Sequence, residues 1–413
     1  MKQKDAKLDI NATRRAFLGF LAAHLAVPNA ALARDILRLN ASEMHLHPAL
    51  RIRLGEDFRL QLVNDLDAPL ALHWRGLRLP NDMDGVPGLT GNAIAPGDRV
   101  DIGFTPPDVG TFLYHPSLRS HAAMQMARGF VGLFIVEEKQ PPQTDADLAI
   151  LLSESTDEKG ERIILANDRR QLETMALPPQ ARIRLRIGNG SSRRMMAIGI
   201  DGAIAQVAAI DGQPCGLFEP ARQTLPLVPG SRYDLFFDLP NHADANVSFV
   251  LRGAGEATQT ILRWRTHGKA RALLEPFAGL PANPKLPVRI ALEKSRRAEL
   301  VIDQAPDGRS WRLNEQVADE IGPKPFLSIP RGTPVMLNLV NRSKLAQIIH
   351  VHGHALRHIH ALDDGWEPYW RDSVVVPAER NLRIAFVADN PGKWLIAGGF
   401  GVGEGPLGWF EVN

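Results

Sequence analysis

The sequence predicts an all-β protein built from three β-sandwich domains in tandem. Short runs alternate apolar and polar residues, as in 50–54, 58–63, 183–187 and 334–340. A period of two places one face of a strand on a core and the other face on solvent. Turn signals such as Pro229-Gly230 separate the runs, and long amphipathic helix patterns are missing. Many short strands divided in this way are typical of sandwiches or barrels.

A strand-ending motif occurs three times, as Leu62-Val63-Asn64, Ile187-Gly188-Asn189 and Leu339-Val340-Asn341. The spacings of 125 and 152 residues each suit one sandwich, which indicates three units of one type. Chance recurrence of common strand-turn residues is the alternative. Proline-rich linkers near 141 and 281 place the expected domains at 34–140, 141–275 and 276–413.

Residues 1–33 have the pattern of an export signal. Three lysines and the pair Arg14-Arg15 precede an apolar stretch that ends in Ala31-Leu32-Ala33, an A-x-A cleavage pattern. Adjacent arginines before Phe-Leu are typical of a twin-arginine signal, which predicts a bacterial periplasmic protein. The alternative is a buried or membrane-anchoring helix, but the stretch is short and contains His24 and Pro28. We expect no transmembrane span in the mature chain.

Composition excludes several classes of protein. The 413 residues include 48 Lys and Arg and 46 Asp and Glu, of which residues 1–33 hold five and two, so the remainder carries a net charge of −1. This balance gives no reason to expect a nucleic-acid partner. The single cysteine, Cys215, excludes a disulfide framework within the chain, a cysteine-rich zinc site and a cysteine-ligated iron–sulfur cluster.

Four histidines stand out as candidate metal ligands: His73, His115, His350 and His352. On a strand, residues i and i+2 point to the same side, so His350 and His352 are expected to present two imidazoles to one place. Paired imidazoles suit copper or zinc without naming the metal. A lone histidine is more often a satisfied core or surface residue.

The mature chain resembles the three-domain multicopper oxidases of the laccase type. The resemblance covers essentially 34–413 and rests on segments at 73–87, 110–115, 129–136, 200–202, 229–234, 350–354, 370–374 and 386–394. It implies three cupredoxin-like Greek-key β-sandwich domains. Members of this family hold a type 1 copper on a cysteine and two histidines, and a trinuclear copper cluster on eight histidines in four His-x-His pairs.

Carried over position by position, the resemblance places non-ligand residues at many copper-ligand positions. The first two pairs read His73-Trp74-Arg75 and His115-Pro116-Ser117, whereas the third pair, His350 and His352, is intact. The positions without the expected ligand are Arg75, Ser117, Gln347, Ala397, Gly398, Gly399 and Gly403. No His, Cys or Met follows Trp394, so no shift of the alignment recovers the fourth pair.

Blue copper needs a thiolate beside two histidines. Cys215 stands in the second domain without a histidine nearby in sequence, and we expect it to be an inert, partly buried thiol. We therefore do not expect laccase-type four-copper activity.

Two interpretations of the four remaining histidines stay open. They either bind one Cu(II) or Zn(II) between the first and third domains, or bind no metal. Arg75, two residues from His73, should project to the same side, where its charge would repel a dication. It could also fill the space of a missing copper if a carboxylate pairs with it, the candidates being Asp82, Asp84 and Glu404.

The favoured expectation is an exported, copper-free binding or scaffold protein, a pseudoenzyme on an oxidoreductase-like fold with a degenerate copper site. The resemblance implies such a role because the family includes twin-arginine substrates associated with cell division and envelope integrity, so an envelope protein is the expected partner. The alternative is a mononuclear copper or zinc protein. In both, the glycine-rich stretch 398–408 replaces a rigid copper-binding strand, either as relaxed structure or as a binding groove.

Overall fold

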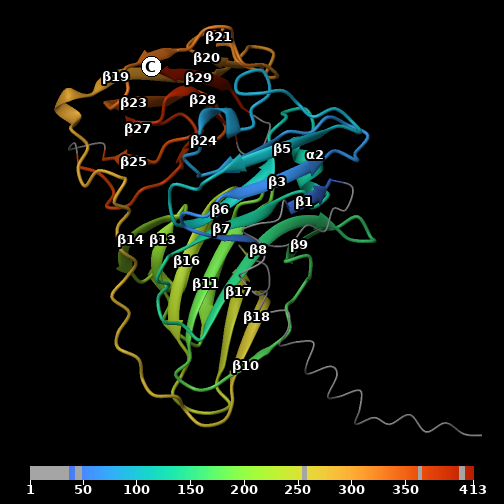
Figure 1. Ribbon diagram of the computed structural model, residues 1–413, viewed down its shortest axis with the longest axis vertical. Coiled ribbons are helices and arrows are strands. Elements are labelled where there is room, and N and C mark those ends of the chain that lie inside the picture. The colour runs from blue at the N-terminus through green and yellow to red at the C-terminus, as the bar shows by residue number, and fades with distance from the viewer. Residues whose placement is uncertain (1–36, 42–48, 254–257, 361–364, 400–404) are drawn as a thin grey trace, which may run out of the picture.

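The computed structural model describes residues 37–41, 49–253, 258–360, 365–399 and 405–413, without the side chains of Arg38 and Asn40. The expected signal at 1–33 lies outside these residues, as do Gly403 and Glu404. Within them, six sheets form three sandwiches stacked along the long axis of the molecule, with the second sandwich at one end and the third at the other (Figure 1). The predicted all-β fold is confirmed.

The first sandwich packs a three-stranded sheet against a four-stranded sheet. The three-stranded sheet has the order β1 (Leu37–Asn40), β3 (Phe58–Val63), β5 (Arg99–Phe104). The four-stranded sheet has the order β2 (Ala49–Arg53), β7 (Gly132–Glu137), β6 (Gly110–Pro116), β4 (Leu72–Arg75). A 3-10 turn, η1 (Asn81–Met83), follows β4, and the short helix α2 (Ala122–Ala127) lies between β6 and β7.

The second sandwich has five strands facing six. The five-stranded sheet has the order β10 (Met175–Leu177), β18 (Gln259–Thr266), β17 (Asn246–Arg252), β12 (Met196–Asp201), β15 (Thr224–Leu227). The six-stranded sheet has the order β14 (Gln213–Phe218), β13 (Gln206–Ile210), β16 (Arg232–Asp238), β11 (Arg182–Asn189), β8 (Ala146–Thr156), β9 (Arg162–Ala166). The 3-10 turn η2 (Ala221–Gln223) precedes β15.

The third sandwich repeats this plan after a strand-free stretch and the turn η3 (Leu292–Lys294). One sheet has the order β21 (Gln316–Val317), β20 (Trp311–Leu313), β19 (Arg296–Gln304), β23 (Thr333–Asn341), β27 (Asn381–Ala388), β25 (Leu356–Ile359). The other has the order β22 (Leu327–Ile329), β29 (Leu407–Val412), β28 (Gly392–Ala397), β24 (Gln347–Val351), β26 (Ser373–Val376). The domain boundaries expected at 140 and 275 fall in strand-free segments, and they stay predictions.

The three repeated asparagines have one structural role. Asn64, Asn189 and Asn341 are each at most 1% exposed at the end of a central strand. Each side-chain amide donates to two or more backbone carbonyls, and each side-chain oxygen accepts from the backbone N–H two residues later. The sequence repeat therefore marks the same turn in every sandwich.

In β11, apolar and polar residues alternate as predicted, but the polar residues do not face solvent as the prediction required. Arg184 and Arg186 do not face solvent: both are 1% exposed, and both bind the Asp234 carboxylate. Asp147 and Glu138 complete this network between the first two sandwiches. The polar face of β11 is thus an interdomain surface, where charged groups are paired rather than hydrated.

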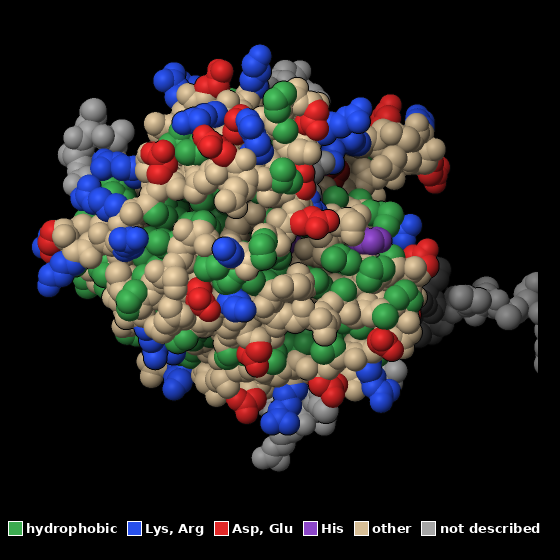
Figure 2. Space-filling view, turned by 90° about the horizontal axis from the view of Figure 1, so that it is seen from above, with side chains coloured by type: hydrophobic (Ala, Val, Ile, Leu, Met, Phe, Trp, Pro, Cys, Tyr) green, Lys and Arg blue, Asp and Glu red, His purple; other side chains and the backbone are tan. Residues whose placement is uncertain are grey.

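On the face seen from above, positive and negative side chains are mixed and neither forms a continuous patch (Figure 2). This pattern matches the small net charge of the chain. None of the helices in the described residues is long and apolar enough to cross a membrane.

Candidate metal centre

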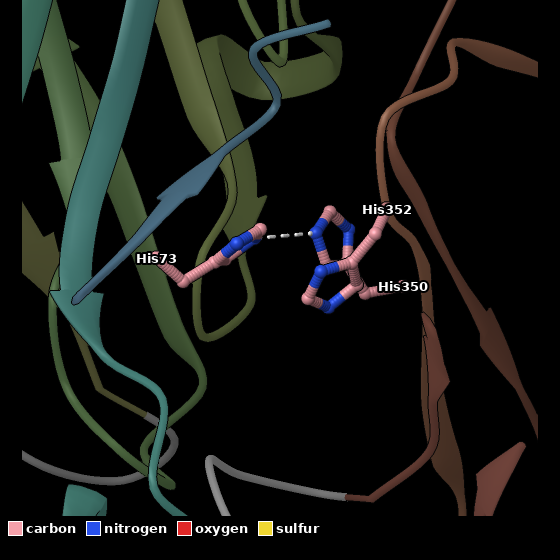
Figure 3. Close-up of side chains that lie close together, drawn as sticks. All are labelled: His73, His350 and His352. Atoms are coloured by element: carbon pink, nitrogen blue, oxygen red, sulfur yellow. Dashed lines mark hydrogen bonds between the residues drawn. The ribbon is translucent and has the colours of Figure 1, made fainter. Parts of the chain in front are cut away.

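The four candidate histidines meet where the first sandwich faces the third. His73 lies in β4, directly opposite His115 in β6, and His350 lies in β24 with His352 just beyond its end. All four are buried, with exposed fractions of 2 to 7%. In Figure 3, His73 reaches from one side while His350 and His352 approach from the other. The fold thus joins residues that are 277 positions apart in the chain.

Three of these side chains form a convergent set of nitrogen ligands. One ring nitrogen from each of His73, His350 and His352 lies within 4.8 Å of the others. Nε2 of His73 is 3.2 Å from Nε2 of His350. Two imidazoles bound to one ion at about 2.0–2.1 Å have their nitrogens about 3.2 Å apart when the angle at the metal is near 100°. The donor set and the spacing of the His73–His350 pair therefore fit a single Cu(II) or Zn(II).

Hydrogen bonds at Nδ1 fix the orientation of these rings. Nδ1 of His73 donates to the backbone carbonyl of Asp84 at 2.9 Å, and Nδ1 of His350 to the carbonyl of Asp372 at 2.9 Å. Nδ1 of His352 donates to the carboxylate of Asp84 at 3.0 Å. A proton held on Nδ1 leaves the lone pair on Nε2, which is the arrangement that metal-binding histidines adopt.

His115 is prepared in the same way and lies beside the three. Its Nδ1 donates to the carbonyl of Pro116 at 2.8 Å, and its ring centroid is 5.4 Å from that of His73. Its buried Nε2 has no hydrogen-bond partner among the described residues. A buried acceptor without a partner is costly, which makes His115 a fourth candidate donor.

The electrostatics keep the imidazoles ready to bind a metal. Burial lowers the pKa of His352 to about 4, and it holds the pKa of His115 and of His350 well below the usual range. These rings are therefore neutral at pH 7, as ligation requires. Burial acts to raise the pKa of Asp84, but His352 and His73 outweigh it and lower that pKa below its usual range. Asp84 therefore remains an anion that holds both rings.

The positions expected to lack copper ligands surround the same space. Together with the four histidines, a cavity of about 770 Å³ is lined by Arg75, Ser117, Ala397, Gly398 and Gly399. The Ser117 hydroxyl donates to the carbonyl of Gly85 at 2.5 Å. Gln347 is fully buried next to this region in β24, with its side-chain oxygen unpaired among the described residues. The assignment of these positions as lost copper ligands stays a prediction.

The carboxylate that pairs with Arg75 is Asp372, which is none of the three candidates expected from the sequence. Arg75 does project to the side of His73, and both line the cavity. Its nearest carboxylate is Asp372, 3.8 Å from Nε, whereas Asp84 is engaged with His73 and His352. Glu404 lies outside the described residues. Asp372 is contributed by the third domain, so a contact across domains replaces the local one expected from sequence.

The remaining sequence candidates do not join the centre. Cys215 is buried in the core of the second sandwich, and burial raises the pKa of its thiol to about 12. It therefore stays protonated at neutral pH, as expected for an inert thiol. His121, six residues after His115, pairs with the Ser120 hydroxyl beside α2 and does not join the centre. Sequence reasoning missed Asp84 and Asp372 as the groups that orient the rings, because neither stands near the third-domain pair or the first-domain pair in a recognisable spacing.

Comparisons with known proteins place this fold in a family. Two sequence models described as multicopper oxidase match residues 28–141 and 286–397. Multicopper oxidase MmcO of Mycobacterium tuberculosis is 24% identical over 415 residues, covering 84% of this chain and 77% of that protein. Copper resistance protein A of Pseudomonas syringae pv. tomato is 37% identical over 113 residues, which cover 27% of this chain and only 18% of that protein.

Solved structures agree. A multicopper oxidase from Pseudomonas thermotolerans superposes with a TM-score of 0.77 at 27% identity, covering 89% of this chain and 92% of that one. Lac15 from a marine microbial metagenome gives a TM-score of 0.72 at 28% identity, covering 88% and 91%. Family matches at residues 28–141 and 286–397 and a structural likeness over 89% of the chain lead to one conclusion: the chain is a member of the multicopper oxidase family.

Proposed function

We propose that this protein binds one Cu(II) or Zn(II) ion between its first and third domains, with His73, His350 and His352 as ligands and His115 as a further donor. The observation that carries the proposal is the convergence of three ring nitrogens within 4.8 Å, each ring oriented through Nδ1. The geometry thus favours a mononuclear metalloprotein over the copper-free scaffold that the sequence favoured.

The proposed chemistry is narrower than that of a four-copper oxidase. The sequence contains one cysteine, and Cys215 is buried in the second domain, so no thiolate is at hand for a blue copper. An ion held by His73, His350 and His352 would have a fourth position, for His115 or for a small ligand, and sites with three protein ligands are typical of catalytic rather than closed structural sites. Such an ion would supply Lewis-acid or limited redox chemistry, or would itself be handled as cargo. We further propose an exported, periplasmic protein, since residues 1–33 have the pattern of a twin-arginine signal.

The experiment is a measurement of bound metal. The purified protein is incubated with Cu(II) or Zn(II) and desalted, and metal per chain is determined by mass spectrometry. The proposal expects about one ion per chain and its loss in His350→Ala. His121→Ala serves as the matched control, because His121 pairs with Ser120 outside the centre, and it keeps the ion.

One observation supports the metal-free scaffold instead. The measurement of metal per chain distinguishes it from the proposed metalloprotein. Arg75 adds a positive charge to the lining of the cavity that holds the histidines, which opposes a dication. Metal near zero in the wild type supports the scaffold and contradicts the proposal. An intense blue absorption, or uptake of dioxygen during phenol oxidation, contradicts both the single-metal and the metal-free interpretation. Either result would show that the protein is an oxidase.

A further inference from the structure

Arg75 is a buried cation whose pairing is incomplete. Its side chain is 9% exposed, and its Nε and Nη2 are buried without a hydrogen-bond partner among the described residues. Its one ion pair with the part of the chain that the structure describes is the 3.8 Å contact between Nε and the carboxylate of Asp372. That carboxylate is already engaged by Arg232 at 2.7 Å. Buried guanidinium nitrogens without hydrogen bonds are costly, so the site is suited to a partner that the described residues do not supply.

The guanidinium is held in place along the cavity wall. It packs closely against Gly230, where an added Cβ would lie 2.5 Å from Nε of Arg75. Gly230 has φ +82° and also lines the cavity. Arg75 is the last residue of β4, and its side chain is thus held against the turn before β16. Part of its surface lines the cavity.

The rest of the cavity is mostly apolar and suits an organic body. Its walls include Leu113, Met126, Val131, Ile348, Leu395 and Leu407. Its volume of about 770 Å³ lies within the range of about 300–1,000 Å³ that small-molecule sites occupy. Apolar walls with a few convergent polar groups, here Arg75 and the unpaired Nε2 of His115, are typical of sites that orient a ligand by its polar end.

Charge limits the ligand to a monoanion. The other cationic side chain of the lining, Arg119, is already paired: it donates to the carbonyl of Gly405 at 2.6 Å and lies 3.7 Å from Asp319. Glu320 also lines the cavity, so only the end at Arg75 is positive.

We propose that this cavity binds a small organic carboxylate with an apolar body, whose carboxylate oxygens accept hydrogen bonds from the guanidinium of Arg75. Planar arginine matches a carboxylate through two parallel N–H donors. The site does not require the metal ion, so it stands or falls independently of the proposed metal centre.

Calorimetry with a matched pair of probes tests the proposal. The protein is treated with a chelator, desalted, and titrated at pH 7 with benzoate and with benzamide, which has the same size without the charge. We expect benzoate to bind at least about tenfold more tightly than benzamide. Equal affinities for the two probes overturn the proposal, whether or not any variant folds.

Variants locate the anion site. Arg75→Met is expected to weaken benzoate binding about tenfold or more, and Arg75→Lys to recover part of the loss, since lysine keeps the charge without the planar fork. Arg53→Met, which removes an exposed arginine outside the cavity lining, is expected to leave benzoate binding unchanged. An unchanged affinity in Arg75→Met, or an equal loss in Arg53→Met, overturns the assignment.

A last arm separates organic from inorganic anions. Inorganic phosphate and chloride compete with benzoate in the same titration. Weak competition by both supports a ligand with an apolar body. Displacement by phosphate at concentrations similar to those of benzoate itself overturns that part of the proposal, because it assigns Arg75 to an inorganic anion.

Discussion

Nε2 of His73 lies 3.2 Å from Nε2 of His350 across the boundary between the first and third domains. Both rings donate from Nδ1 to a backbone carbonyl, of Asp84 and Asp372, so their Nε2 lone pairs face each other. Two facing acceptors repel unless a cation lies between them. An ion at the proposed site would therefore couple metal binding to the docking of the two domains.

This coupling predicts that metal stabilises the folded protein. Adding Cu(II) or Zn(II) at about one hundred times its Kd raises the free energy of unfolding by about 2.7 kcal/mol, because the ion binds only the docked state. The measurement is thermal unfolding with and without chelator. His73→Ala and His350→Ala abolish the shift, whereas His121→Ala retains it. An equal shift in His350→Ala places the ion elsewhere.

Asp84 is predicted to act through the rings it orients. Its carboxylate accepts from His352, and its backbone carbonyl accepts from His73. Asp84→Asn is expected to lower metal affinity about 10–100-fold, as loss of a group that orients metal ligands does elsewhere. Asp82→Asn is the control, since Asp82 is exposed two residues away in η1. The affinities come from competition with a chelator of known strength; similar losses in the two variants contradict the role of Asp84.

The interface between the first two domains predicts a dependence of stability on pH. Burial acts to raise the pKa of Asp147, but Arg186 and Arg51 outweigh it and lower that pKa to about 2. A depressed pKa in the folded state contributes stability above the ordinary value near 3.8, and this contribution is lost as pH falls toward 2. Asp147→Asn is therefore less stable than wild type at pH 6, and the difference shrinks between pH 4 and pH 2.

Denaturant unfolding at several pH values measures this difference. Asp101→Asn is the control, because Asp101 is exposed and accepts a hydrogen bond from Gln61 without a buried network. A gap between wild type and Asp147→Asn that widens as pH falls has the wrong sign and contradicts the account.

The repeated asparagines predict equivalent losses in separate sandwiches. Asn189→Ala removes the amide that serves the carbonyls of Arg194 and Leu227 and the oxygen that serves Ser191. Leaving buried polar groups unpaired costs about 1–3 kcal/mol, and Asn341→Ala is expected to cost a similar amount. Asn246→Ala, at the exposed start of β17, stays within about 0.5 kcal/mol of wild type. Chemical denaturation measures the free energy of unfolding of all three variants. A negligible loss in both Asn189→Ala and Asn341→Ala would contradict a shared stabilising role of the repeated asparagines.

The sequence predicts the strands and the histidine set well because both follow from local rules. The runs at 58–63 and 334–340 correspond to β3 and β23, and a period of two suffices to recognise them. His350 and His352 share one place, with ring centroids 4.6 Å apart, because strand residues two apart point to the same side.

The sequence does not predict the contacts between the domains. Arg184 and Arg186 alternate with apolar residues as solvent-facing residues do, and only the docked first domain reveals their burial. The pairing of Asp372 with Arg75 and Arg232 joins three domains, so no local spacing indicates it. Contacts between distant segments depend on tertiary packing, which periodicity does not contain.

Anomalous diffraction from crystals of the copper-loaded protein tests the central claim most directly. The account predicts one copper peak between β4 and β24, about 2.0–2.1 Å from a ring nitrogen of His73, His350 and His352. Four peaks in the arrangement of a laccase, a peak bound elsewhere, or no peak at these histidines would contradict it.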